Sequence, residues 1–333
     1  MVYLHKDKER FREAIDLVVY KTGISSQAVE KDYYVTMILK LLAEEMPFIV
    51  FKGGTSLSKC HKVIRRFSED IDLSVDEYIS QGQRKKLKQA IVKVTEMLGL
   101  EIENLEDTRS RRVYNKYIVP YQTVLFNENA ALQPAVSIET SLAALAFPAN
   151  VMPVSSFVGD MILEEAPQLI EEYGLDTFEM KVQQVNRTLA EKVFAICDYY
   201  LRGEVHKYSR HLYDIYKLLP HVPQDEAFRD LVAEVRRIRK GLITVHRRKT
   251  GWTSQRCSGK SCQRRSIKVI TSMLRSICSR RRFRMIRSSL LLRKLLQERC
   301  LNDALIERSV WSAPTSTGAG SDTTASRSEA RKC

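Results

Sequence analysis

The stretch Phe51-Lys-Gly-Gly-Thr-Ser-Leu-Ser-Lys59 decides the fold. The run before it, Phe48-Ile-Val-Phe51, is β-branched and aromatic, which predicts a short strand. The two glycines predict a tight turn, and residues 55–65 predict a helix. Glycine lets backbone amides approach a phosphate at a helix N-terminus, although the GxxxxGK[ST] spacing of a Walker loop is missing. We therefore predict a phosphate-binding turn, with Lys59 one helical turn beyond it touching the same phosphates, formed by Lys52, Gly53, Gly54, Thr55 and Ser56.

A pair of carboxylates follows in Phe67-Ser-Glu-Asp-Ile-Asp-Leu-Ser74. On a strand, Asp70 and Asp72 point to one face while the apolar residues between and after them point to the other. Adjacent carboxylates repel unless a cation lies between them, and hard oxygen donors suit Mg²⁺. Glu139, on a strand predicted for residues 135–141, is the candidate third carboxylate. The alternative for Glu139 is a charge on an edge strand.

The rest of the chain predicts an α+β fold. Alternating residues predict strands at 114–125 and 135–141, and periodic apolar residues predict helices, among them 189–201 and 209–219. Strands and helices mix up to residue 150, whereas helices dominate from 160 to 245. We therefore expect an α+β domain over residues 1–150, a mainly helical domain completing the site over 151–249, and a separate tail over 250–333.

Composition separates this tail from the remainder. The chain has 333 residues, 44% of them hydrophobic, and a net charge of +14. Residues 250–333 hold 14 Arg and 4 Lys against 5 acidic residues, or +13, together with five of the seven cysteines. The tail is either a basic RNA-binding or membrane-surface extension or an out-of-frame product. No apolar run reaches ~20 residues and no secretory signal is visible, so we expect a cytoplasmic protein without a membrane partner.

The motifs together resemble the AbiEii/AbiGii-type toxin nucleotidyltransferases, a branch of the DNA polymerase β-like superfamily. The glycine turn and the carboxylate pair carry the resemblance, and Glu30-Lys-Asp-Tyr-Tyr-Val-Thr36 is similar to that family's N-terminal helix. Two later motifs agree, Leu189-Ala-Glu-Lys192 and Arg210-His-Leu-Tyr-Asp214. His211 departs from the family pattern, in which an acid is usual after the arginine.

The resemblance implies a polymerase β-like sheet with flanking helices and a role for each motif. Gly53, Gly54 and Ser56 would hold a triphosphate, with Ser68 beside the metal pair. Lys192 would be a cationic phosphate ligand, and Asp214 either positions Lys192 or assists proton transfer. The alternative for Asp214 is an ion pair with Arg210 within one helix.

The implied function is a Mg²⁺-dependent nucleotidyltransferase of a toxin–antitoxin or abortive-infection system. It would transfer a nucleotidyl group from an NTP to an acceptor hydroxyl, such as a tRNA 3′ end, and would have a cognate antitoxin. Two alternatives stay open: a GTP- or NTP-binding regulator without turnover, and a transferase that modifies a protein.

Overall fold

A mixed six-stranded sheet forms the centre of the molecule. The computed structural model describes residues 2–125, 132–143, 145–202 and 208–250. The strand order is β3-β4-β2-β1-β6-β5, with β2·β4 and β1·β6 parallel and the other three pairs antiparallel. This confirms the α+β fold expected from the sequence. The strands are β1 (Ile49–Lys52), β2 (Asp70–Val75), β3 (Tyr114–Pro120), β4 (Ala135–Ser141), β5 (Ala149–Val154) and β6 (Phe178–Gln183).

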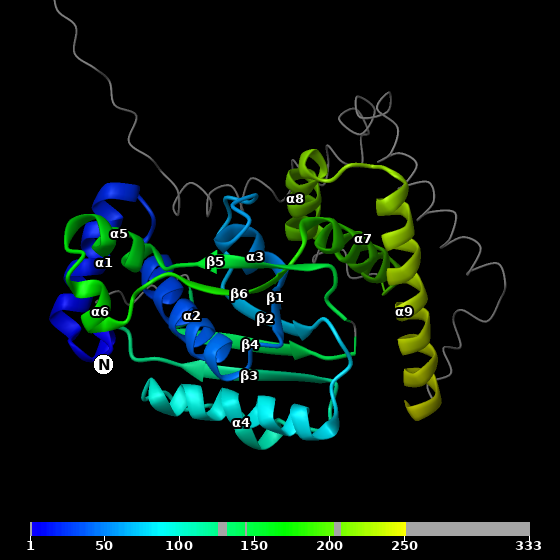
Figure 1. The fold of residues 1–333 in the computed structure, drawn as a ribbon, viewed down its shortest axis with the longest axis horizontal. Helices are drawn as coiled ribbons and strands as arrows, with labels where there is room; N and C mark the ends of the chain where they lie inside the picture. Colours follow the sequence, from blue (N-terminus) through cyan, green and yellow to red (C-terminus); the bar gives the residue numbers. More distant parts are fainter. Residues whose placement is uncertain (1, 126–131, 144, 203–207, 251–333) are drawn as a thin grey trace, which may run out of the picture.

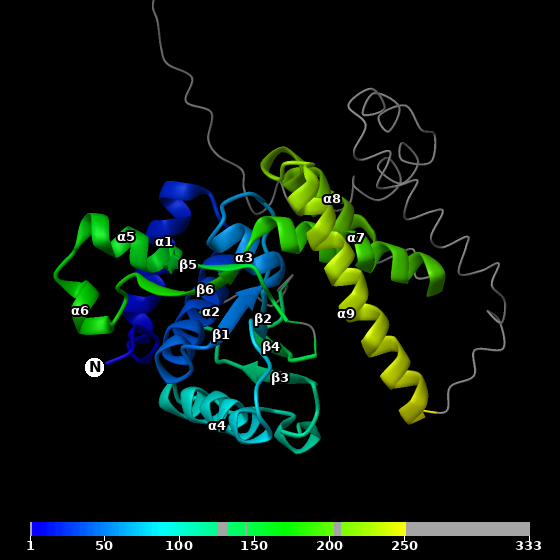
Figure 2. The same cartoon turned by 45° about the vertical axis from the view of Figure 1, so that its right-hand side comes forward.

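Helices flank this sheet on several sides. The first helix and the helices of the β5–β6 connection lie toward one end of the sheet, whereas the helices from residue 185 onward stand at the other (Figures 1 and 2). The α-helices are α1 (Lys8–Thr22), α2 (Ser26–Glu45), α3 (Gly53–Lys59), α4 (Gln81–Met97), α5 (Phe157–Glu165), α6 (Leu169–Tyr173), α7 (Val185–Arg202), α8 (Tyr208–Leu218) and α9 (Glu226–Thr250). Short 3-10 turns are η1 (Leu4–Lys6), η2 (Leu105–Asp107) and η4 (Leu219–His221).

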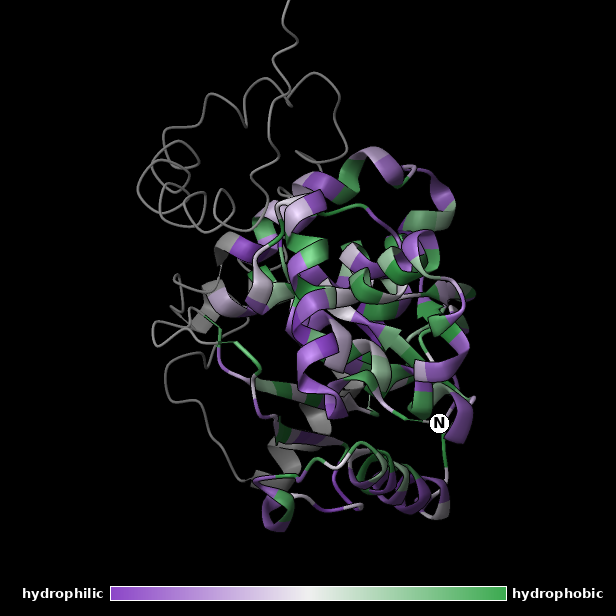
Figure 3. Ribbon diagram, turned by 90° about the vertical axis from the view of Figure 1, so that its left-hand side faces the viewer, coloured by the Kyte–Doolittle hydropathy of each residue, from purple (hydrophilic) through white to green (hydrophobic). Residues whose placement is uncertain are grey.

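Local sequence explains where several helices begin and end. Gly23 ends α1 in the left-handed conformation, at φ 71°, which costs glycine little. Ser80 and Gln83 form a reciprocal capping box at the start of α4. Hydrophobic and hydrophilic residues alternate along the helices in Figure 3, as expected for elements with one buried face.

The sheet extends further along the chain than the sequence predicted. Helices were expected to dominate beyond residue 160, yet β6 lies in that region and pairs with β1. β5, which spans the domain boundary expected at residue 150, pairs with β6 at the sheet edge. The sequence did not predict β5 or β6, because short strands of mixed polarity carry little periodic signal. The mainly helical part instead begins at α7.

Two apolar cores follow from this arrangement. The larger one packs the sheet against α1, α2, α4 and α5. The smaller one holds Leu189 and Val193 of α7, Ile215 of α8 and Val235 of α9 together with Leu57 of α3. Helix α3, whose first turn contains the two glycines, therefore joins the helical part to the sheet.

Three consecutive charged residues of α2 are buried and anchor separate segments. Glu30 accepts hydrogen bonds from Thr123 Oγ1 and Val124 N, both at 2.8 Å. Lys31 pairs with Glu69 and donates to the Gln133 carbonyl at 2.9 Å. Asp32 accepts from Phe157 N at 2.9 Å and pairs with Lys59 at 2.7 Å. Buried charges with such partners avoid the cost of leaving a charge unpaired in the interior.

Over the described ranges, no helix is both long and apolar enough to span a bilayer. The basic tail of residues 250–333 lies, after Thr250, outside the described residues.

Candidate active site

The glycine turn and the carboxylate pair meet at the end of β1. Register pairs Lys52 of β1 with Asp72 of β2, so the turn that follows Lys52 lies against the Asp72 side chain. A Cβ placed on Gly53 would lie 1.9 Å from Asp72 Oδ2, and Gly53 has φ +80°. A Cβ on Gly54 would lie 2.7 Å from Ser68 Oγ. Only glycine at these two positions leaves room for the Asp72 carboxylate and the Ser68 hydroxyl.

Replacing Gly53 with alanine should therefore disturb this site strongly. We expect a loss of about 2 kcal/mol in the free energy of unfolding, from the strained backbone and from displacement of the Asp72 carboxylate. Gly82→Ala is the matched control, because the nearest atom to its new Cβ is Ser80 Oγ at 3.7 Å. That variant should be neutral or slightly more stable. Chemical denaturation measures both, and equal effects in the two variants would contradict the steric argument.

Strand β2 presents the two aspartates to one face, as predicted. Ile71 and Leu73, on the opposite face, are completely buried. Asp70 pairs in register with Ser137 and Asp72 with Glu139 on the parallel strand β4, while Glu139 pairs with Lys116 on β3. A transverse row of charged residues, Lys52, Asp72, Glu139 and Lys116, thus crosses four adjacent strands, which lie about 4.8 Å apart.

Burial and like charges make the aspartates reluctant to ionise. Burial raises the pKa of Asp72 to about 6. The charge of Lys52 opposes this shift, whereas repulsion from Glu139 and Asp70 adds to it. Burial, Glu69 and Glu139 also raise the pKa of Asp70. Within the described residues, neither aspartate forms an ion pair shorter than 4 Å. Two carboxylates this close together, with no cation among the described residues paired to either of them, favour a bound cation.

Mg²⁺ fits this donor set in its preferred manner, through one or two carboxylates together with phosphate oxygens of a substrate. The predicted third ligand does not join the pair in its present rotamer. Glu139 is adjacent to Asp72 in register, but its Oε1 accepts from Lys116 Nζ at 3.0 Å. Among the described residues, no group of three or more His, Cys, Asp or Glu has the geometry of a metal site. Asp70 and Asp72 are therefore the residues that would hold the ion.

The helical part supplies a cation opposite the carboxylates. Lys192 of α7 pairs with Asp214 Oδ2 of α8 at 2.7 Å. Arg66 donates to both oxygens of Asp214, each at 2.8 Å. The Asp214 side chain is fully buried, and although burial opposes its ionisation, Arg66 and Lys192 lower its pKa. Asp214 thus pairs with Arg66 and Lys192, and the alternative of an ion pair with Arg210 is not what the structure contains.

A second ion-pair network lies behind the glycine turn. Lys52 Nζ donates to Glu191 Oε2 at 3.2 Å, and Arg187 Nε donates to Glu191 Oε1 at 3.0 Å. Burial raises the pKa of Glu191, but Lys52 and Arg187 outweigh it and lower the pKa overall. Arg187 also donates to the carbonyls of Leu145 and Phe147, which fixes α7 to the segment between β4 and β5.

These elements line a cleft of about 840 Å³ between the sheet and helices α7, α8 and α9. The predicted residues Lys52, Gly53, Gly54, Ser68, Asp70, Asp72, Glu139 and Lys192 all line it. The structure therefore brings together most of the predicted site residues from four separate segments of the chain. A cleft of this volume is within the ~300–1,000 Å³ range of small-molecule sites.

Four predicted residues do not line this cleft: Asp214, which lies buried behind Lys192, and Lys59, Ser56 and Thr55. Lys59 is buried, pairs with Asp32 and donates to Thr36 Oγ1 and the Ser155 carbonyl, each at 2.7 Å. The prediction that Lys59 touches the same phosphates is wrong, because its side chain points to the other side of α3. Ser56 is completely buried and donates to the Gly53 carbonyl at 3.0 Å, and Thr55 hydrogen-bonds the Asp70 carbonyl at 2.6 Å. Both hydroxyls brace the turn.

Several residues of the cleft were missed from the sequence. Arg66 lies in an irregular segment, and its partner is 148 residues away. Tyr199 and His211 stack with ring centroids 5.5 Å apart. Burial, followed by the charge of Lys192, lowers the pKa of His211 to about 4, so its imidazole is neutral at pH 7. For His211, the only signal in the sequence was its position within the Arg210–Asp214 motif.

The fold and cleft define an α+β protein in which a glycine turn, two strand carboxylates and a helix lysine surround one site. A profile of the family described as nucleotidyl transferase AbiEii toxin, type IV TA system, matches residues 36–276. The chain belongs to this AbiEii family, which confirms the resemblance inferred from its motifs.

Among solved structures, the chain is similar to MenT4, nucleotidyltransferase toxin Rv2826c from Mycobacterium tuberculosis H37Rv. The sequence identity is 22% and the TM-score is 0.35, over 56% of this chain and 58% of that one. The similarity thus spans less than two thirds of the length of MenT4. A search of curated proteins gave no significant match.

Proposed function

We propose that this protein is the nucleotidyltransferase toxin of a type IV toxin–antitoxin system. The observation that carries the proposal is the meeting of Gly53, Asp70, Asp72 and Lys192 around one cleft. Family membership supports the same activity. We extend the proposal to a polymerase β-like arrangement of the sheet, to an NTP substrate and to a cognate antitoxin as partner.

The residues divide the work of the reaction between two sides of the cleft. Backbone amides of the Gly53–Gly54 turn and the Lys192 ammonium bind the triphosphate, while Asp214 positions Lys192. Asp70 and Asp72 would hold Mg²⁺, which would supply charge neutralisation at the reacting phosphate and lower the pKa of the attacking hydroxyl. The acceptor oxygen forms a bond to the α-phosphorus, the bond to the pyrophosphate oxygen breaks, pyrophosphate leaves with the bonding electron pair, and the hydroxyl proton passes to solvent water in the open cleft.

Glu139 and Ser68 have finer roles in this proposal. Glu139 would be the third carboxylate of the site once released from its ion pair with Lys116. Ser68, whose Oγ lies against Gly54, contacts the phosphates beside the metal pair. We also propose the domain division predicted from the sequence, in which the helical part completes the site through Lys192.

Two other functions use the same residues. A regulator would bind NTP in the cleft without turnover, and a protein-directed transferase would modify a hydroxyl of Ser, Thr or Tyr. The retained carboxylate pair favours turnover over regulation. For the acceptor we propose RNA, with a tRNA 3′ end as the first candidate.

The test incubates the full chain with Mg²⁺ and each α-labelled NTP, once with total tRNA and once with total cell protein. We expect label in RNA with one preferred nucleotide, and at least a 100-fold lower rate for Asp70→Asn. Label on a protein would identify the alternative acceptor. Binding of NTP without transfer to either class of acceptor would overturn the transferase proposal in favour of a regulator.

A further inference from the structure

A second pocket lies on the opposite side of α3 from the proposed active site. Its volume is about 250 Å³, and its lining includes Ser58, Lys62, Arg65, Phe67 and Phe157. Arg66 and Ser68 line both this pocket and the active-site cleft, so the two are neighbours. Nothing in the proposed reaction accounts for it.

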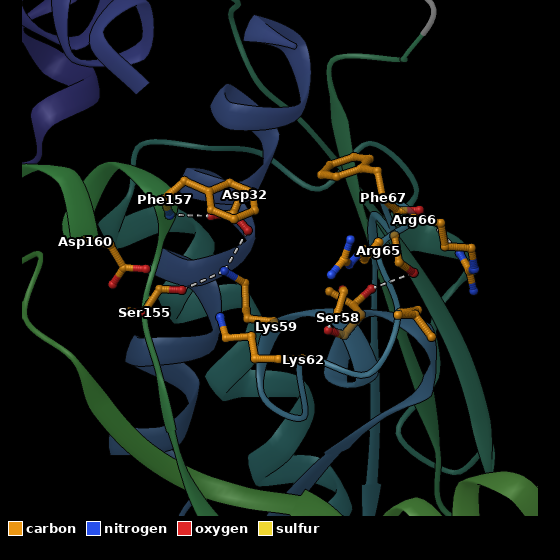
Figure 4. A pocket seen from close by; sticks show the side chains of 13 residues that line it. Asp32, Ser58, Lys59, Lys62, Arg65, Arg66, Phe67, Ser155, Phe157 and Asp160 are labelled. Carbon is orange, nitrogen blue, oxygen red and sulfur yellow. Dashed lines mark hydrogen bonds and ion pairs between the residues drawn. The ribbon is translucent and has the colours of Figure 1, made fainter. Parts of the chain in front are cut away.

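Two aromatic side chains face each other across the pocket. Figure 4 shows Phe67 and Phe157 on opposite sides of the opening, Phe67 from the segment before β2 and Phe157 from the start of α5. Both are partly buried and pack against the larger core, and Lys59 Nζ lies 5.9 Å from the centroid of the Phe157 ring. Aromatic faces that stay accessible provide stacking surfaces for planar rings, and each stacked base contributes about 1–3 kcal/mol.

The charges around the opening are positive on balance. Lys62 and Arg65 are exposed, and neither side chain forms an ion pair with any described residue. The other two cations are neutralised, Lys59 by Asp32 at 2.7 Å and Arg66 by Asp214 at 2.8 Å. Asp160 is the exposed carboxylate of the lining, and as an acceptor it suits a sugar hydroxyl.

The backbone also keeps Lys62 at this opening. Lys62 has φ 54°, a left-handed conformation that is uncommon for a residue with a side chain. Such strain is maintained where the surrounding structure or a function requires it. The turn brings the chain back from α3 so that both Lys62 and Arg65 line the pocket.

We propose that this pocket binds one nucleotide unit, with its base between Phe67 and Phe157 and its phosphate on Lys62 and Arg65. The volume of about 250 Å³ is just below the ~300–1,000 Å³ of ordinary ligand sites and limits the occupant to a single nucleoside. The unit is either a free mononucleotide or the end of an RNA strand. Only the second source rests on the proposed function, because the strand would be the acceptor reaching the neighbouring cleft.

The test measures binding of AMP and of the trinucleotide ApApA by calorimetry, with the full chain in EDTA. Lys192→Ala serves as the background, since it weakens nucleotide binding in the cleft, while Lys192 does not line the second pocket and Arg66 keeps both hydrogen bonds to Asp214. On that background, Lys62→Ala/Arg65→Ala and Phe67→Leu should each raise the Kd for AMP by about 10-fold. Lys85→Ala/Lys86→Ala, on α4, is the matched control and should leave the Kd unchanged.

The two sources separate by the ligand that binds better. ApApA binding at least as tightly as AMP supports a strand end, and AMP binding alone supports a free nucleotide. An AMP affinity that does not change in Lys62→Ala/Arg65→Ala, or no binding by either ligand, overturns the pocket assignment. If transfer activity is absent but AMP still depends on Lys62 and Arg65, the proposed function fails and the pocket assignment stands.

Discussion

Asp214→Ala is expected to lower the free energy of unfolding by about 3–5 kcal/mol, because it leaves two cations unpaired in the interior. Arg66 and Lys192 both lose their partner, and the vacated carboxylate position is fully buried. The same change frees Lys192, so transfer activity should fall by about 100-fold or more. Asp230→Ala, an exposed position on α9, is the control and should change stability by less than about 0.5 kcal/mol.

A double variant separates the two consequences. In Asp214→Ala/Lys192→Met one of the two unpaired buried charges is removed, so part of the lost stability should return while activity stays low.

The pH dependence of stability gives a further check on Asp214. Because the pKa of Asp214 is lowered in the folded protein, its contribution to stability is present above the ordinary pKa of 3.8 and disappears at lower pH. Equal stability of Asp214→Ala and wild type at pH 7 would contradict the assignment.

Asp72→Asn is expected to abolish transfer and, in the absence of metal, to make the protein more stable. The pKa of Asp72 is raised to about 6, so its ionised form costs folding free energy. The cost begins as pH rises through the unfolded pKa near 3.8 and is complete above 6. The gain from Asp72→Asn should therefore be about 1–3 kcal/mol at pH 7.5 and vanish near pH 4. Asparagine has the shape of aspartate, so the contact with Gly53 is retained.

Thermal denaturation in EDTA at both pH values measures this gain. Adding Mg²⁺ should stabilise the wild type and leave the stability of Asp72→Asn unchanged, because only the intact carboxylate pair binds the ion. Asp107→Asn, an exposed aspartate in η2, is the matched control and should show neither effect. If Asp72→Asn were less stable than the wild type at pH 7.5 in EDTA, the claim that ionised Asp72 costs folding free energy would be refuted.

Local signals predicted the parts of the site that lie within one segment. The alternation around Ile71 and Leu73 fixed the face of the two aspartates, and the glycines marked the turn beside them. The strand carrying Glu139 was also predicted, but its neighbour was not, since only the parallel pairing of β2 with β4 places it next to Asp72. Pairing between distant strands follows from tertiary packing.

The errors have the same origin. Lys59 was placed by helical periodicity, which gives the spacing along α3 but not the side of the cleft that a side chain faces. Its actual partner, Asp32, is in α2. Arg66 gave no signal because it belongs to neither a helix nor a strand. Lys192 and Asp214 came from family resemblance, and the structure explains them by a direct contact of 2.7 Å.

The three buried charges of α2 have a consequence for how the molecule opens. Glu30 holds the segment after β3, Lys31 the segment before β2, and Asp32 the start of α5. Unwinding one turn of α2 would strand three charges at once and release three loops, so this turn and those loops form one cooperative unit. Their amide hydrogens should exchange together, at a free energy close to that of global unfolding, and Lys59 links α3 to the same unit.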